Sequence, residues 1–126
     1  MTDKDIFIDS LKKRTKKFGV DVILFCDSLK ACKASSVITY QLVKAATSTG
    51  ANYRSACRGR SDNEFFNKTC IVVEEADESV FWLEVIEDSG LSNNLIELKR
   101  LLEEGTEILK IVSKTKDTTY KKLNSK

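Results

Sequence analysis

Apolar side chains recur at helical intervals in four long stretches of the chain. In residues 2–29 they follow one another at spacings of three, four or seven, which places them on one face of a helix. The same period returns in residues 36–58, 61–89 and 94–116. We expect four helices with these inward-facing positions: Leu11, Thr15, Phe18, Val22, Phe25, Leu29; Ile38, Leu42, Ala45, Thr49, Asn52, Ala56; Phe65, Thr69, Val72, Ala76, Ser79, Leu83, Ile86; Leu95, Leu98, Leu102, Gly105, Leu109 and Val112.

Polar residues predict where the helices begin. Thr2 offers a capping hydroxyl with an acid three residues later. The run Ser61-Asp62-Asn63-Glu64 is a full capping box, in which the first and last side chains bond reciprocally to backbone N–H groups. Asn94 precedes a similar arrangement. The second helix should begin after Ser35 or Ser36, since residues 30–36 are mostly small and polar.

Glycines and short connections predict how the helices end and pack. Gly59 is expected in the left-handed conformation that often follows a helix, and Gly90 should end the third helix. The segment after about Lys116 loses the apolar period, and we expect it to fray. Residues 45–51 are all small, so the second helix should be tightly packed. Short connections make consecutive helices antiparallel neighbours, so the predicted fold is all-α: an up-down-up-down antiparallel four-helix bundle in a single domain over residues 1–126.

Composition fits a soluble helical domain. The chain of 126 residues contains no proline, which permits helices longer than three turns. Charged residues make up 32% and hydrophobic residues 41%, the balance of a folded rather than a disordered chain. No apolar run approaches the roughly 20 residues that cross a bilayer. The first residues lack the basic-then-apolar order of a signal peptide. We expect a cytoplasmic protein without a membrane partner.

The lack of histidine excludes several kinds of catalytic chemistry. Serine or cysteine nucleophiles that need a histidine base cannot be built, nor can mixed cysteine-histidine zinc sites. The five glycines are scattered and form no phosphate-binding loop. We therefore expect a protein that is not an enzyme and holds no metal or cofactor. Four cysteines, none in a Cys-x-x-Cys pair, are expected as reduced thiols in or near the core: Cys26, Cys32, Cys57 and Cys70.

Charge is segregated along the chain. Residues 11–17 hold five bases and no acid, whereas residues 74–88 hold seven acids and no base. Between residues 37 and 60 every charged residue is basic: Lys44, Arg54, Arg58 and Arg60. Because arginine forks match phosphate oxygens, these four residues are candidates for binding RNA or DNA. The alternative is a solvated face whose cations pair with the acidic helix of the same bundle or of a neighbouring subunit.

Other polar residues are expected to fix how the helices pack. Glu75 and Glu78 lie three apart on one helix face. We expect them to form a structural polar network by reaching Gln41, Asn52, Lys44 or Lys68. A di-iron site would need histidines in addition to these glutamates, so it is excluded. Trp82 is either an interface anchor or a core residue whose indole N–H is hydrogen-bonded.

The stretch from Gln41 to Glu84 resembles a known family. It contains QLVKAATSTGANYRSACRGRSDNEFFNK and then IVVEEADESVFWLEVI, close to the four-helix-bundle proteins encoded in intervening sequences of bacterial 23S rRNA genes. Those proteins share a Gly-Ala-Asn segment, a Ser-x-x-(Asp/Glu)-Phe helix start and a Trp-Leu pair. The matching positions here are Gln41, Lys44, Ser48, Gly50, Asn52, Ser61, Glu64, Phe65, Lys68, Glu75, Glu78, Trp82 and Leu83.

The resemblance implies an assembly and two possible functions. The family's bundles form homo-oligomers, typically a homopentamer, and a similar accessory protein of diversity-generating retroelements partners a reverse transcriptase and nucleic acid. Many relatives carry an acid where this chain has Ser55, so the role of that acid does not carry over. We expect a non-catalytic oligomeric bundle that binds nucleic acid or a nucleic-acid-processing protein partner. The alternative is a self-assembling structural or protein-interaction adaptor that binds no nucleic acid.

Overall fold

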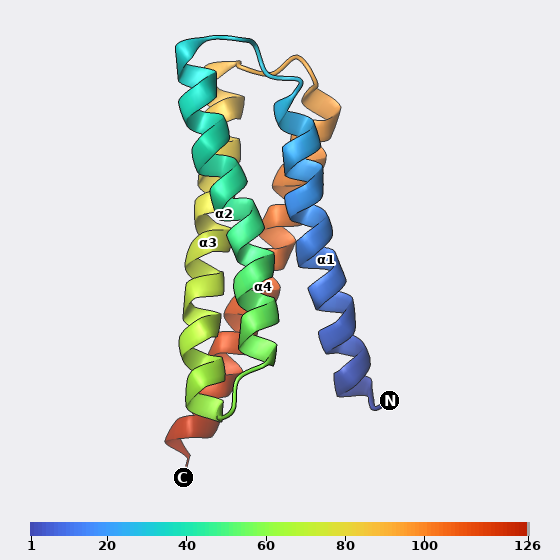
Figure 1. The fold of residues 1–126 in the computed structure, drawn as a ribbon, viewed down its shortest axis with the longest axis vertical. Coiled ribbons are helices and arrows are strands. Elements are labelled where there is room, and N and C mark those ends of the chain that lie inside the picture. The colour runs from blue at the N-terminus through green and yellow to red at the C-terminus, as the bar shows by residue number, and fades with distance from the viewer. Residues whose placement is uncertain (126) are drawn as a thin grey trace.

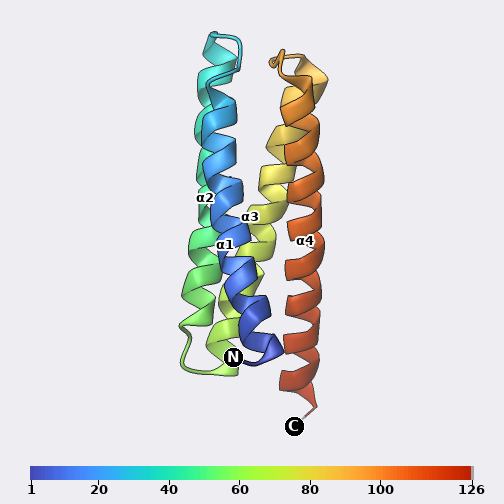
Figure 2. The same cartoon turned by 90° about the vertical axis from the view of Figure 1, so that its right-hand side faces the viewer.

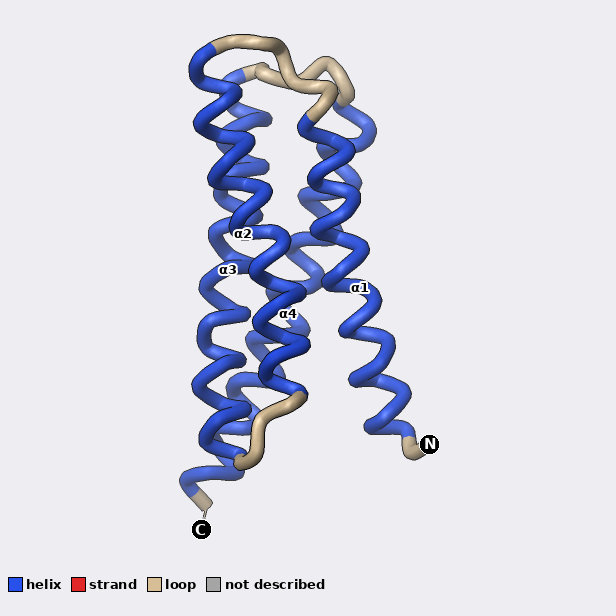
Figure 3. Tube along the Cα trace, in the orientation of Figure 1, coloured by secondary structure: helices blue, strands red, loops and turns tan. Residues whose placement is uncertain are grey.

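Four α-helices account for almost all of the structure, a computed structural model that describes residues 1–125 (Figure 1). Helix α1 spans Asp3–Cys26, α2 Lys33–Cys57, α3 Asp62–Ser89 and α4 Leu95–Asn124. Short loops join the helices (Figure 3), and the described residues contain no strand beyond an isolated bridge between Leu29 and Ser92. The predicted all-α fold is confirmed.

Consecutive helices run in opposite directions, and both chain ends lie at the same end of the bundle (Figures 1 and 2). This is the predicted up-down-up-down order. Helix α2 packs against α1 and α3, and α4 packs against α3, whereas α1 and α4 share the smallest contact. Two ion pairs join these last helices: Arg14 to Glu104 at 2.7 Å and Arg100 to Asp21 at 3.0 Å. Nearer the chain ends, α1 diverges from α4 (Figure 1).

The core follows most of the predicted inward-facing positions. In α3, all six predicted positions after Phe65 are buried. Leu95 is an exception, because it stands 65% exposed at the first turn of α4. A bundle helix buries three or four positions in every two turns, whereas the predicted positions follow a narrower line of two in every two turns. The structure accordingly adds four buried hydrophobic residues: Ala46, Tyr53, Leu101 and Ile108.

Helices α1 and α2 approach each other closely at two glycines. A Cβ atom added to Gly50 would lie 3.2 Å from backbone atoms of Thr15 and Lys16. One added to Gly19 would lie 3.3 Å from the Cα atom of Thr47. Gly50 belongs to the small-residue stretch 45–51, so the tight packing predicted for the second helix is present.

Capping side chains set the helix starts, with one departure from prediction. Thr2 Oγ1 accepts a hydrogen bond from the Asp5 N–H at 3.1 Å, and the Asp5 carboxylate accepts from the Thr2 N–H at 3.2 Å. Ser61 caps α3 by accepting from the Glu64 N–H at 3.1 Å. The Glu64 carboxylate, however, accepts from the N–H of Arg60 rather than from that of Ser61. The predicted capping box is therefore only half formed: Ser61 caps the helix, and Glu64 instead holds the preceding loop through a hydrogen bond.

The junctions on either side of α2 differ from the prediction. Helix α2 begins at Lys33 rather than after Ser35 or Ser36, because the Cys32 thiol accepts from the Ser35 N–H at 3.4 Å and acts as the cap. Gly59 does not take the predicted left-handed conformation. Helix α2 ends at Cys57, the C-cap Arg58 has a φ of −96°, and the Gly59 N–H donates to the Ala56 carbonyl at 3.0 Å. Among the described residues the left-handed conformation belongs to Gly90, which follows α3 with a φ of 68°.

Helix α4 continues well past Lys116, so the predicted fraying of the tail is wrong for the described residues; residue 126 lies outside them. The helix ends at Asn124. Thr119 is only 9% exposed, and the ring of Tyr120 lies 5.8 Å from the ring of Phe66 in α3. Contacts with the first turns of α3 therefore order a segment whose composition is mostly polar.

Candidate nucleic-acid interface

A basic groove lies between α1 and α2, where the two glycines bring these helices together. Its cations are Lys12, Lys13 and Lys16 from α1 and Arg54 from α2, and its volume is about 410 Å³. Arg54 follows Gly50 by about one helical turn, so the close approach places the arginine beside the lysines of α1. Between the cations the surface is mainly small or apolar: Thr15, Gly19, Val20, Ile23, Thr47, Gly50 and Ala51.

The four predicted nucleic-acid-binding residues are all exposed, but they do not form one cluster. Arg54 lines the basic groove, and Arg58 stands one turn further along as the C-cap of α2. Arg60 lies in the following loop and lines a different cleft at the end of the bundle. Lys44 acts electrostatically on Glu75 of α3. The structure thus joins Arg54 with the lysines of α1 rather than with the other three predicted residues.

Within residues 1–125, neither the cations of the basic groove nor the acids of residues 74–88 in α3 take part in an ion pair. The five pairs are Arg14–Glu104, Lys17–Asp21, Arg100–Asp21, Arg100–Glu97 and Lys122–Asp62. None of them uses a cation of the groove, one of the four predicted cations or an acid from residues 74–88. Within this part of the chain no ion pair joins the predicted basic residues to the acids of residues 74–88, although Lys44 acts electrostatically on Glu75.

The predicted polar network does not form as a hydrogen-bonded unit. Within residues 1–125 no hydrogen bond joins Gln41, Asn52, Glu75 and Glu78 to one another; the Asn52 amide donates to the Ser48 carbonyl of its own helix at 2.9 Å. Burial raises the pKa of Glu75, and the charge of Glu78 raises it further, whereas the ammonium group of Lys44 lowers it. Lys44 of α2 and Glu75 of α3 thus interact electrostatically.

Comparisons with known proteins connect this fold to a family. A family profile described as 23S rRNA-intervening sequence protein matches residues 10–114. The chain belongs to this family. Among solved structures it is similar to a protein with unknown function from the S23 ribosomal protein family of Bacteroides thetaiotaomicron. The TM-score is 0.76 and the identity 26%, over 84% of this chain and 97% of that chain. No curated protein matches.

The resemblance to the 23S rRNA-intervening sequence proteins is therefore confirmed, and several residues that carry it have structural roles here. Gly50 permits the close approach of α1. Ser61 caps α3 and Glu64 braces the preceding loop. Leu83 is fully buried in the core. In this family member, these positions help to specify the bundle.

Trp82, another position of the family pattern, combines features of both predicted alternatives. It is half-buried and packs against the core. Its ring meets that of Phe81 edge-on at 5.0 Å, and Phe81 is 53% exposed. Within the part of the chain that the structure describes, the buried indole Nε1 has no hydrogen-bond partner. The expectation of a bonded indole N–H is therefore not met in the single chain.

The four cysteines are free thiols in different surroundings. Cys32 is exposed, and the other three are half-buried. Hydrogen bonds from Ser35 lower the pKa of Cys32, whereas burial raises the pKa of Cys57 despite a hydrogen bond with Tyr53. Burial also raises the pKa of Tyr53. Across residues 1–125 no group of three or more histidine, cysteine or carboxylate side chains is placed to hold a metal ion.

The lysine-rich run of residues 11–17 is visible in the sequence, but the sequence does not show that it lies beside Arg54. The two glycines indicate this proximity indirectly. Gly19 and Gly50 lie where the backbones of α1 and α2 come close, and Lys16 and Arg54 are each about one turn from one of these glycines. Among the described helices, none is both long enough and apolar enough to span a membrane.

Proposed function

We propose that this protein is a non-catalytic helical bundle that assembles into a homo-oligomer and binds RNA or DNA phosphates through the basic groove. The proposal rests on one observation: four cations from two helices line the groove, and none has an ion pair within residues 1–125. Such cations bind phosphate without reading base sequence. The lack of histidine supports a non-catalytic role, and the free thiols suit the cytoplasm.

Fluorescence anisotropy with a labelled single-stranded RNA and the matching DNA tests the groove. Affinity is expected to fall steeply between about 50 and 200 mM salt, because bound phosphates release counterions. A variant with Lys13→Gln, Lys16→Gln and Arg54→Gln should bind more weakly. Its plot of log affinity against log salt should be shallower by about 0.7 to 0.9 for each phosphate that the variant no longer neutralises.

The matched control carries Lys30→Gln, Lys33→Gln and Lys99→Gln, which remove the same charge from exposed positions outside the groove. This control should bind like the wild type. A further variant, Arg58→Gln with Arg60→Gln, measures whether the site extends to the end of α2. If the groove variant binds as tightly as the control and with the same salt dependence, the groove is not the site.

A second function is favoured by the outward face of α3. Ile71 and Phe81 are 37% and 53% exposed, and Glu74 and Glu78 lie between them at the three- and four-residue spacings of one helix face. This acidic and apolar stripe complements the basic groove, which has an apolar surface of its own. The alternative is therefore a self-assembling adaptor in which a neighbouring copy's α3 fills the groove and no nucleic acid binds.

Size-exclusion chromatography with light scattering separates the two functions. Both require a homo-oligomer, and the family resemblance suggests a homopentamer; a monomer at micromolar concentration would exclude assembly. If α3 fills the groove, Arg54→Glu should dissociate the oligomer, and adding Glu78→Arg in the same chain should restore assembly. If the groove binds nucleic acid instead, Arg54→Glu should lose RNA binding while the oligomer persists.

A further inference from the structure

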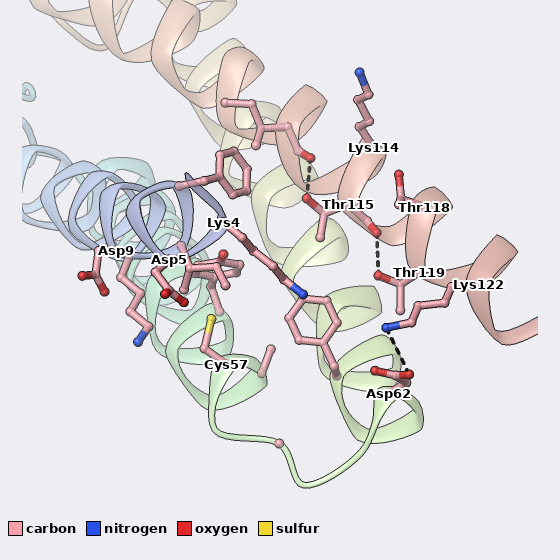
Figure 4. Close-up of a pocket in the computed structure, with 18 of the residues that line it drawn as sticks. Lys4, Asp5, Asp9, Cys57, Asp62, Lys114, Thr115, Thr118, Thr119 and Lys122 are labelled. Carbon is pink, nitrogen blue, oxygen red and sulfur yellow. Dashed lines mark hydrogen bonds and ion pairs between the residues drawn. The ribbon is translucent and has the colours of Figure 1, made fainter. Parts of the chain in front are cut away.

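A larger cleft opens at the end of the bundle that holds both chain termini. The first turns of α1 diverge here from the last turns of α4 (Figure 1), and the cleft between them has a volume of about 1060 Å³. Lys4 reaches from α1 into this terminal cleft, as Figure 4 shows. The volume lies at the upper end of the roughly 300–1,000 Å³ of small-molecule pockets.

Ion pairs close the terminal cleft at two of its edges. Arg14 follows the cleft-lining part of α1 and lies 2.7 Å from Glu104 of α4, so the two helices are tied together where the cleft ends. On another side Lys122 of α4 lies 3.4 Å from Asp62 of α3 (Figure 4). Residues 59–61 of the loop between α2 and α3 also line it. A cleft closed in this way suits a compact ligand better than a partner helix running through it.

The inner surface of the terminal cleft is apolar. Where α1 and α4 separate, their inward-facing side chains do not meet, and they line the cleft instead. The apolar lining consists of Phe7, Ile8, Tyr53, Ala56, Phe65 and Ile111. Phe7 is 48% exposed and contributes open apolar surface, whereas Tyr53 and Ala56 are each only 1% exposed and lie beneath it. Apolar surface left open to water favours a ligand that covers it.

Cations surround this apolar surface. Lys4, Lys12, Arg60 and Lys114 line the terminal cleft, and none of them has an ion pair within residues 1–125. Three carboxylates also line it. The carboxylate of Asp62 pairs with Lys122, so four cations without an ion pair face the carboxylates of Asp5 and Asp9. The net charge around the cleft is therefore positive.

We propose that the terminal cleft binds a single-chain amphiphile with an anionic head, such as a long-chain carboxylate or an alkyl phosphate. The alkyl chain lies on the apolar surface between α1 and α4, and burial of its methylenes supplies affinity. The head group meets the cations at the rim, with Lys4 the nearest candidate because its side chain already extends into the cleft (Figure 4). Lys12 lines both this cleft and the basic groove, but the proposal does not rest on the function proposed for the groove.

Isothermal titration calorimetry of the full chain with monomeric octanoate, decanoate and dodecanoate tests the proposal. Affinity should rise about fourfold for each methylene, with one ligand per chain. Dodecyl phosphate distinguishes the two head groups, since the tighter of the two dodecyl ligands identifies the preferred anion. Dodecyltrimethylammonium has the same tail with a cationic head and should bind more weakly than both.

Substitutions inside the terminal cleft locate the bound ligand. Thr115→Trp and Thr118→Trp add bulk from α4 and should each weaken dodecanoate binding by about tenfold or more, as expected when two methylenes lose their burial. Thr118 is exposed, so its substitution is expected to leave the fold intact, which circular dichroism checks. Lys4→Gln should weaken binding by up to about fivefold, the usual range for an exposed ion pair.

Matched controls are Lys110→Trp on α4 and Lys30→Gln, both exposed and outside the cleft, and they should bind dodecanoate like the wild type. Three results would each overturn the proposal. One is wild-type affinity in both tryptophan variants. Another is an affinity that does not change with chain length. The third is binding to anionic vesicles without binding to monomeric dodecanoate.

Discussion

Gly50 sets the distance between α1 and α2. A Cβ atom at this position would lie 3.2 Å from three backbone atoms of Thr15 and Lys16, which cannot rotate away as a flexible side chain would. Gly50→Val should therefore push the helices apart and lower the free energy of unfolding by about 1–3 kcal/mol, the usual cost of overpacking. Urea unfolding measures the effect. Ala51→Val, at the exposed neighbouring position, controls for placing valine in a helix, and equal stability of both variants would contradict the prediction.

Glu75 gives the protein a predicted pH dependence. Burial, together with the charge of Glu78, raises its pKa above the ordinary value of 4.5, although Lys44 partly offsets this. A carboxyl group whose pKa is raised by folding binds its proton more tightly in the folded state. The free energy of unfolding therefore falls as pH rises from the unfolded-state pKa through the folded-state pKa. Glu75→Gln removes this loss, so the variant should gain stability relative to the wild type as pH rises above about 4.5.

Urea unfolding at several pH values between about 4 and 7 measures that gain. Glu84→Gln serves as the comparison, because Glu84 is an exposed carboxylate on the same helix. A stability difference between Glu75→Gln and the wild type that stays constant across this range would show that Glu75 does not titrate as described.

At the scale of the helices, the last turns of α4 link it to the start of α3. Tyr120 packs on Phe66, and Lys122 pairs with Asp62. A chain that ends after Lys116 lacks both Tyr120 and Lys122. The resulting decrease in stability of about 1–2 kcal/mol should lower its Tm by roughly 3–10 °C. Differential scanning calorimetry tests this, with a chain that ends after Asn124 as the control; an unchanged Tm in the shorter chain would mean that these turns contribute no stability.

Helix bodies were predictable from the sequence, and helix ends were less so. An apolar period repeats over many turns, so a single exception such as Leu95 does not hide the helix. A helix end depends on one or two local bonds. The Cys32 thiol takes the place of the usual capping oxygen, and the tail of α4 is ordered by contacts with α3 rather than by a strong period of its own.

At the scale of the whole molecule, only part of the candidate site was predictable. Arg54 was selected from the sequence, but its partners in the basic groove come from α1, and their proximity depends on how the glycines of the two helices meet. The lack of ion pairs between the basic residues and residues 74–88, within the part of the chain that the structure describes, was equally unpredictable. Opposite charges within one chain look like partners in the sequence, whereas the ion pairs of residues 1–125 use neither the groove nor residues 74–88. The terminal cleft depends on the divergence of α1 from α4, which no local pattern encodes.

The order in which the helices pack has a consequence for how the protein folds. Each helix packs mainly on its neighbour in the sequence, and the contact between α1 and α4 alone joins the two ends of the chain. A low contact order of this kind is typical of domains that fold in microseconds to milliseconds. Helices α1 and α2 can pair as soon as both have left the ribosome, before α4 is made. We expect the closure of α4 against α1 to come last, and the terminal cleft lies where these two helices stay apart.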